Sequence, residues 1–267
     1  MTRIFSRLRA LAADYKLLLR SIPSLTVSIF VLSVVCANLM ANKELVSTRY
    51  VALDCGFAFS WIMFLCMDVI CKRWGAGAAV KVSLLALAVN LAVCGSFALL
   101  AKAPGCWGAF YDTNNPAVND ALNATFGGSW YVVFGSALAF LVSSVTNAVL
   151  NVGIGDALTA RSIGGFRAFA IRSYLSTLVA QFVDNFVFAT VVSKLFFGWT
   201  WTQVVVCSII GAVCELLCEV FFSGIGYRVV CAWENEQVGA AYLEHLNRTA
   251  LSPNSADGLA TKNTKNA

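Results

Sequence analysis

The chain has 267 residues, of which 59% are hydrophobic and only 12% are charged. A soluble globular domain carries about 25% charged residues, so this composition excludes a protein whose whole surface faces water and predicts extensive contact with lipid. The net charge of +5 does not indicate a nucleic-acid partner, because the lysines and arginines cluster at the ends of apolar segments and form no stripe that could follow a phosphate backbone.

Six apolar segments are long enough to cross a bilayer, since a spanning helix needs about 20 largely apolar residues. In chain order the segments are 24–41, 51–71, 80–101, 129–152, 168–197 and 203–231. They predict an all-α membrane protein built as a bundle of six transmembrane helices. The predicted organisation is a basic N-terminal segment (1–23), a transmembrane domain (24–232) and a flexible polar tail (233–267).

The positive charges predict how the bundle is oriented. Only four of the 19 lysines and arginines, Lys43, Arg49, Lys102 and Lys194, fall in segments on one side of the predicted membrane. Because lysine and arginine are enriched in cytoplasmic loops, both termini should lie in the cytoplasm and the polar loop 102–128 should lie outside.

No pattern of an enzyme or of a metal site is found. The ten cysteines contain no CxxC pair, and the single histidine, His245, lies in the tail. A Walker A loop, a nucleophile elbow and a zinc motif are all lacking in the sequence. We therefore expect no catalytic activity, no metal and no cofactor.

Helix 168–197 carries the polar face that most favours a binding site. Gln181, Asp184, Asn185 and Phe188 are spaced i, i+3, i+4 and i+7, which places them on one side of the helix. An ionisable group at the centre of a bilayer costs at least about 2.5–3.5 kcal/mol, so it normally faces a cavity or a partner. Three hydrogen-bonding side chains beside an aromatic ring suit a planar polar ligand. The alternative is a polar contact that only joins two helices.

Four further polar residues are candidates for the same site, and three of them have a structural alternative. Glu215 and Glu219 lie one turn apart on the last helix and repel each other if both ionise, so one of them holds a proton or meets a cation; Glu219 could instead be hydrated near the cytoplasmic end. Asp68 could form an interfacial ion pair with Lys72. Asn38 could be a packing residue between helices.

Two helices carry a family pattern, and most of residues 27–228 follow it. Asp68 and Gly75 stand where this family has an aspartate and, seven residues later, a glycine. The closest segment, helix 168–197, matches the pattern at Arg172, Ser176, Gln181, Asp184 and Phe188. The chain thus resembles the queuosine precursor transporter family, also called the VUT family. It departs from the family at Asn147, where members often have an aspartate, and at Glu215 or a neighbouring residue, where they have a lysine.

The resemblance implies a six-helix protein of the bacterial inner membrane that takes up 7-cyano- or 7-aminomethyl-7-deazaguanine or a related purine-like base. It implies that Asp68, Asp184 and Glu219 line the substrate path, because the N–H donors of a guanine-like edge suit carboxylate acceptors. Phe188 or Trp61 would stack on the ring.

The expected partners are a nucleobase-like small molecule and the lipid bilayer, with a homo-oligomer or coupling subunits left open. The main alternative is the substrate-binding S component of an energy-coupling factor vitamin transporter, which would also have six helices. Ala37 and Ala41 have the small-residue spacing that such a component uses to dock its coupling partner. A membrane scaffold that transports nothing is a third possibility.

Overall fold

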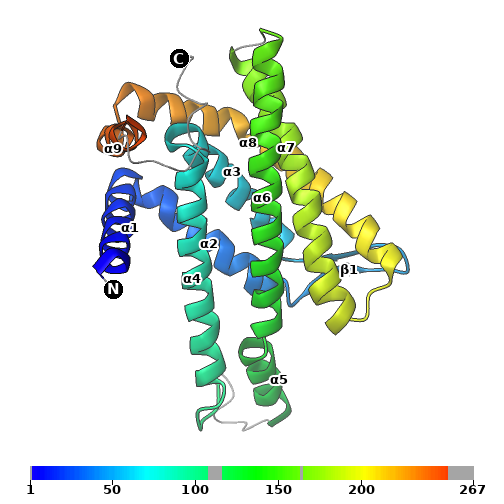
Figure 1. Ribbon diagram of the computed structural model, residues 1–267. Helices are drawn as coiled ribbons and strands as arrows, with labels where there is room; N and C mark the ends of the chain where they lie inside the picture. Colours follow the sequence, from blue (N-terminus) through cyan, green and yellow to red (C-terminus); the bar gives the residue numbers. More distant parts are fainter. Residues whose placement is uncertain (1, 108–115, 163–164, 252–267) are drawn as a thin grey trace.

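The computed structural model describes residues 2–107, 116–162 and 165–251, and it is almost entirely helical (Figure 1). The helices are α1 (Thr2–Ser21), α2 (Ser24–Met40), α3 (Phe57–Trp74), α4 (Ala76–Leu100), α5 (Pro116–Gly127), α6 (Trp130–Ala160), α7 (Gly165–Phe188), α8 (Trp201–Asn235) and α9 (Ala240–Leu251). A π-helix, η2 (Ala189–Lys194), continues α7. Strands β1 (Glu44–Ser47) and β2 (Ala52–Asp54) form an antiparallel hairpin.

Each of the six predicted apolar segments forms a helix, namely α2, α3, α4, α6, α7 with η2, and α8. Within the described part of the chain, four helical stretches have the length and composition of a membrane crossing: Ala76–Leu100, Pro116–Asn147, Tyr174–Lys194 and Trp201–Asn235. A fifth would be formed by α1 and α2 together, which meet at a bend of 104°. The chain is therefore an all-α membrane protein with four or five helices of this kind.

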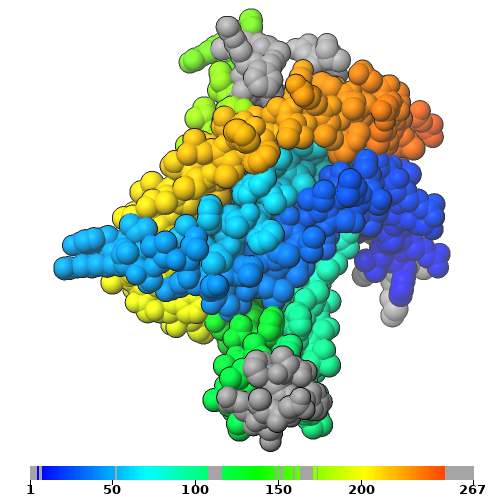
Figure 2. Space-filling model, turned by 180° about the vertical axis from the view of Figure 1, so that it is seen from behind, coloured from blue at the N-terminus to red at the C-terminus, as the bar shows by residue number. Residues whose placement is uncertain are grey.

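The six helices formed by the predicted apolar segments lie in two groups (Figures 1 and 2). Helices α4, α6 and α7 stand side by side, while α2, α3 and α8 slant across the opposite face. The main apolar core joins α1, α2, α3, α4, α8 and α9 and includes Leu18, Phe30, Ile70 and Val82. Helices α3 and α8 approach closely because position 226 is glycine: a Cβ there would lie 3.1 Å from the Cδ1 atom of Leu65.

Helix α9 occupies part of the segment that we expected to be a flexible tail. Its Tyr242 is fully buried in the main core, and the Lys81 ammonium donates a 3.0 Å hydrogen bond to the Tyr242 hydroxyl. Lys81 also forms a salt bridge with Asp14 of α1. This packing explains why part of a polar segment forms a helix; the remainder of the predicted tail, 252–267, lies outside the described residues.

The hairpin projects beyond the helices and is attached to the beginning of α8 (Figures 1 and 2). The Trp199 indole donates a 2.6 Å hydrogen bond to the Glu44 carboxylate, and the Gln203 amide donates a 2.9 Å bond to the Thr48 carbonyl oxygen. At the other end of the hairpin, Gly56 lies against α2. These contacts place Asp54, the last residue of β2, among the ends of α2, α3 and α8.

Candidate functional site

A cavity of about 80 Å³ lies inside the bundle, between α2, α3, α6, α7, α8 and the end of β2. One water molecule needs roughly 10–15 Å³ measured in this way, so the cavity has room for several. Its polar lining side chains are Asn38, Asp54, Ser60, Ser136, Asp184, Asn185 and Glu215. Phe57, Met63 and Phe188 are among the apolar ones. Most ligand sites combine an apolar wall with a few such polar groups.

Glu215 is the most enclosed carboxylate of this cavity, with 2% of the residue exposed. The Ser60 hydroxyl of α3 donates a hydrogen bond to its Oε1 atom, and the Asn185 amide of α7 donates a 3.1 Å bond to Oε2. Gly211 makes room for Asn185, because a Cβ there would lie 3.0 Å from the Asn185 Nδ2 atom. Three helices thus fix the direction of one buried carboxylate.

Asp184 lies where two cavities meet. Besides the larger cavity it lines a smaller one of about 30 Å³, together with Phe30, Met63, Ser136 and other residues. The Ser143 hydroxyl of α6 donates a 2.7 Å hydrogen bond to the Asp184 Oδ1 atom. The Oδ2 atom receives no hydrogen bond from any residue that the structure describes, so it is available to a ligand.

Two more of the predicted residues line the larger cavity. Asn38 is 5% exposed, and its amide nitrogen donates a 2.9 Å hydrogen bond to the Val34 carbonyl oxygen of its own helix. Phe188 follows Asp184 by about one turn and contributes an aromatic wall. Trp61, the other aromatic residue considered for stacking, instead stacks on Phe222 with ring centroids 4.5 Å apart. Phe188 is therefore the better placed of the two.

Gln181 does not belong to this lining, although it shares the polar face of α7. The side chain is fully buried, and neither atom of its amide has a hydrogen-bond partner among the described residues. The residue lies about one turn before Asp184 and is not among the residues that line either of the two cavities at Asp184. Gln181 as a ligand-binding residue therefore stays a prediction that the geometry of this cavity does not favour.

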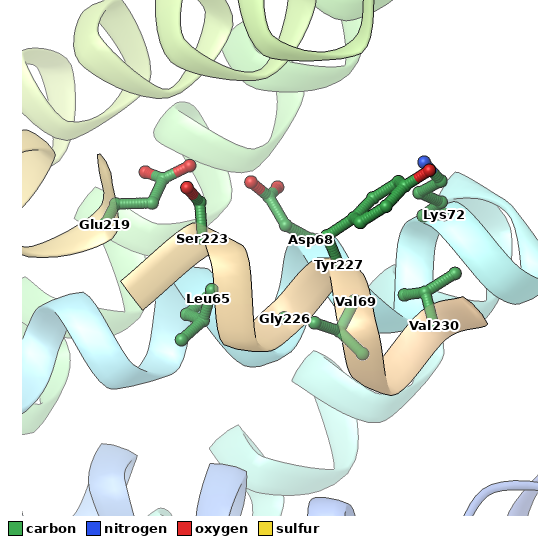
Figure 3. A pocket seen from close by; sticks show the side chains of 9 residues that line it. All are labelled: Leu65, Asp68, Val69, Lys72, Glu219, Ser223, Gly226, Tyr227 and Val230. Atoms are coloured by element: carbon green, nitrogen blue, oxygen red, sulfur yellow. The ribbon is translucent and has the colours of Figure 1, made fainter. Parts of the chain in front are cut away.

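Asp68 and Glu219 lie in a different place, around a small cavity of about 20 Å³ between α3 and α8 (Figure 3). Their carboxylates point toward the same space, on either side of Ser223. The Lys72 ammonium lies 4.8 Å from the centre of the Tyr227 ring at the edge of this cavity. The space holds about one water molecule, so it is too small for a nucleobase. The structure brings Asp68 and Glu219 together, but apart from Asp184.

Asp54 is a lining residue that the sequence analysis missed. The Gly56 backbone N–H donates a 2.7 Å hydrogen bond to its Oδ1 atom. Burial raises the pKa of Asp54 to about 6; the N–H groups of Gly56 and Phe57 oppose this rise, and the charge of Glu44 adds to it. With Asp184 and Glu215, the cavity has three carboxylates, and no lysine, arginine or histidine is among its described lining residues.

The raised pKa of Asp54 predicts how its replacement changes stability with pH. The folded protein holds the Asp54 proton more tightly than the unfolded chain, whose pKa is near 3.8. Stability is therefore highest below about pH 4 and falls as the pH rises to about 6. We expect Asp54→Asn to be more stable than the wild type at pH 7–8, by at most about 3 kcal/mol for a shift of two pKa units, and similar at pH 4.

Melting temperatures of the detergent-purified protein between pH 4 and pH 8 measure this effect. Asp156→Asn, at an exposed aspartate of α6, is the matched control and should follow the wild-type curve. An Asp54→Asn curve parallel to the wild type at every pH would show that Asp54 is not buried as the structure has it.

Ala37 and Ala41, the pair considered for docking of a coupling subunit, also belong to the interior. Both line the larger cavity, and Ala41 is 4% exposed. Their small side chains leave room for Gly56, whose Cβ would lie 3.3 Å from the Ala41 Cβ atom. The small-residue spacing is thus used for packing within the chain.

A comparison with protein families gives one match, to the family described as "Putative vitamin uptake transporter", over residues 54–229. No curated protein and no solved structure matches the chain. The matched region begins at Asp54 and includes Asp184 and Glu215, so it contains all three carboxylates of the larger cavity. It covers most of the chain and agrees with the resemblance found at Asp68 and along α7. The chain belongs to the vitamin uptake transporter family.

Proposed function

We propose that the chain is a stand-alone uptake carrier for 7-cyano- or 7-aminomethyl-7-deazaguanine or a related purine-like base, and that the larger cavity binds this ligand. In this proposal α2, α3, α4, α6, α7 and α8 cross the bacterial inner membrane, with both termini in the cytoplasm. The observation that carries the proposal is a cavity inside the helices whose polar groups are mainly acceptors and whose wall includes an aromatic ring.

The donor pattern of a guanine-like base suits these groups. Its ring N–H and exocyclic amine are adjacent donors, and a carboxylate accepts two such donors side by side. The Asp184 Oδ2 atom is available, Oδ1 keeps a second lone pair beside its bond with Ser143, and Asn38 lines the same cavity from a different helix. Phe188 gives the flat ring an apolar surface, where aromatic pairs contribute about 0.5–1.5 kcal/mol beyond burial.

Two kinds of observation support the proposal. The family match supports uptake of a small molecule through a membrane. The choice of a deazaguanine is supported by the acceptors of the cavity and by the resemblance along α7. The proposal includes no nucleotide-hydrolysing subunit, and the two alanines considered for docking one, Ala37 and Ala41, line the cavity inside the chain.

The test is thermal stabilisation of the detergent-purified protein by 7-cyano-7-deazaguanine, 7-aminomethyl-7-deazaguanine, queuine, guanine and riboflavin. A ligand that binds only the folded state at 100 times its Kd stabilises by about 2.7 kcal/mol. We expect a rise in melting temperature with at least one deazaguanine. Stabilisation by riboflavin alone, together with copurification of ATPase subunits, would favour a vitamin-binding S component. No response to any compound would contradict the proposal.

A further inference from the structure

We infer that the larger cavity selects a ligand that carries a positive charge, so that a base with an ammonium group binds more tightly than a neutral base of the same ring. The inference rests on the proposed function for the place of binding and goes further by naming the charge of the ligand. For the two deazaguanines, it predicts a preference for the 7-aminomethyl compound, which is a cation at neutral pH, over the 7-cyano compound.

The first argument is the charge of the lining. Asp54, Asp184 and Glu215 come from β2, α7 and α8, so three separate elements bring a carboxylate to one cavity. No basic side chain stands among the described lining residues to compensate them. A carboxylate removed from water without a partner of opposite charge is strongly unfavourable. A cationic ligand supplies the missing charge, and a neutral ligand does not.

The second argument is independent of charge and concerns hydrogen bonds. The hydroxyl groups of Ser60 and Ser143 and the amide of Asn185 already donate to the carboxylates. Asn38 is 5% exposed, lines the cavity and donates to Val34, while its amide oxygen accepts no hydrogen bond from the described residues. The Asp184 Oδ2 atom likewise accepts no hydrogen bond from the described residues. Apart from the Ser136 hydroxyl, which can donate or accept, the side-chain groups left for a ligand are thus chiefly acceptors.

An ammonium group fits such a cavity better than a nitrile does. The ammonium has three N–H donors and no acceptor, so it can donate to the Asn38 oxygen and to the carboxylate of Asp54 or Glu215, while the ring edge donates to Asp184. The nitrile nitrogen only accepts, so among the side chains left for a ligand it can bond only with the neutral Ser136 hydroxyl. Because a hydrogen bond to a charged group contributes about 1.5–3 kcal/mol, the expected preference is at least about tenfold in Kd.

The experiment compares two pairs of ligands that differ mainly in charge. One pair is 7-aminomethyl- and 7-cyano-7-deazaguanine, and the other is pyridoxamine and pyridoxine. Titration calorimetry measures the Kd of each compound on the purified wild type. In any pair that binds, the amine should have a Kd at least about tenfold lower than its neutral counterpart. Asp54→Asn and Glu215→Gln should reduce that ratio to about threefold or less. Asp156→Asn, at an exposed aspartate outside the cavity, should leave it unchanged.

Each outcome separates the inference from the proposed function. Equal affinity for both deazaguanines, or tighter binding of the nitrile, would overturn the inference and leave the proposed function standing. A preference for pyridoxamine without binding of any deazaguanine would support the inference and overturn the proposed function. A preference for the amine that persists in both cavity variants would overturn the inference, and no binding at all would overturn both. Asp54→Asn is expected to fold well, so its altered ratio would not reflect unfolding.

Discussion

Cells that produce the Asp184→Asn variant should take up at least about 100-fold less deazaguanine at subsaturating concentration than cells with the wild type. Asparagine has nearly the shape of aspartate, and it can still accept the hydrogen bond from Ser143. It replaces the available Oδ2 acceptor with an NH₂ donor or turns that donor toward Ser143. A ligand edge made of N–H donors loses two charge-assisted bonds in either case, worth about 3 kcal/mol together.

Uptake of a radiolabelled base in cells that lack other routes for it measures this loss. The amount of protein in the membrane must be equal for both variants, and Asp156→Asn should transport like the wild type. Unchanged uptake by Asp184→Asn at equal expression would place the ligand elsewhere. If neither the wild type nor Asp184→Asn takes up the base, and cells with either protein behave alike, a scaffold protein is favoured instead.

Replacing Gly56 with leucine should leave most of the protein molecules unable to fold. A Cβ atom at this position would lie 2.6 Å from the Ala37 carbonyl oxygen and 2.9 Å from the Asp54 Oδ1 atom. The first of these is a backbone atom of α2, so it cannot turn away as a flexible side chain could. Overpacking of this kind typically costs about 1–3 kcal/mol for extra methylenes and more where backbone must move. The hairpin would have to separate from α2.

The yield of monodisperse protein in detergent and its melting temperature measure the effect. Gly153→Leu is the matched control, because a Cβ at this exposed position of α6 meets no atom within 4 Å. That variant should behave like the wild type. A Gly56→Leu protein with normal stability and normal ligand binding would show that the hairpin does not rest against α2 as described.

Apolar length was enough to predict where the main helices form, because a bilayer requires long uncharged stretches. It could not predict α1 and α9, whose helices depend on packing: Leu18 and Tyr242 are buried in the common core. It also placed the start of the second helix at Val51, whereas α3 begins at Phe57. The Asp54 side chain accepts from the Gly56 N–H and forms a turn there, and such local bonds compete with helix formation.

Helical spacing predicted part of the candidate site, but it failed where the neighbouring helices determine which cavity a residue lines. Asp184, Asn185 and Phe188 share a face of α7 and all line the larger cavity. Glu215 and Glu219 share a face of α8 and line different cavities. They are separated by about 6 Å along the helix axis, enough to cross from one cavity to the next. The periodicity of one helix does not reveal which neighbours it meets.

The hairpin supplies the cavity with one carboxylate that does not come from a helix. Asp184 and Glu215 belong to helices of the bundle, whereas Asp54 belongs to β2 of the hairpin. The hairpin is held to the beginning of α8 by the hydrogen bonds of Glu44 and Thr48. Any swing of the hairpin away from the bundle therefore removes one carboxylate from the other two. In the proposed carrier, a displacement of the hairpin would therefore open the cavity and weaken its attraction for a cationic ligand at the same time.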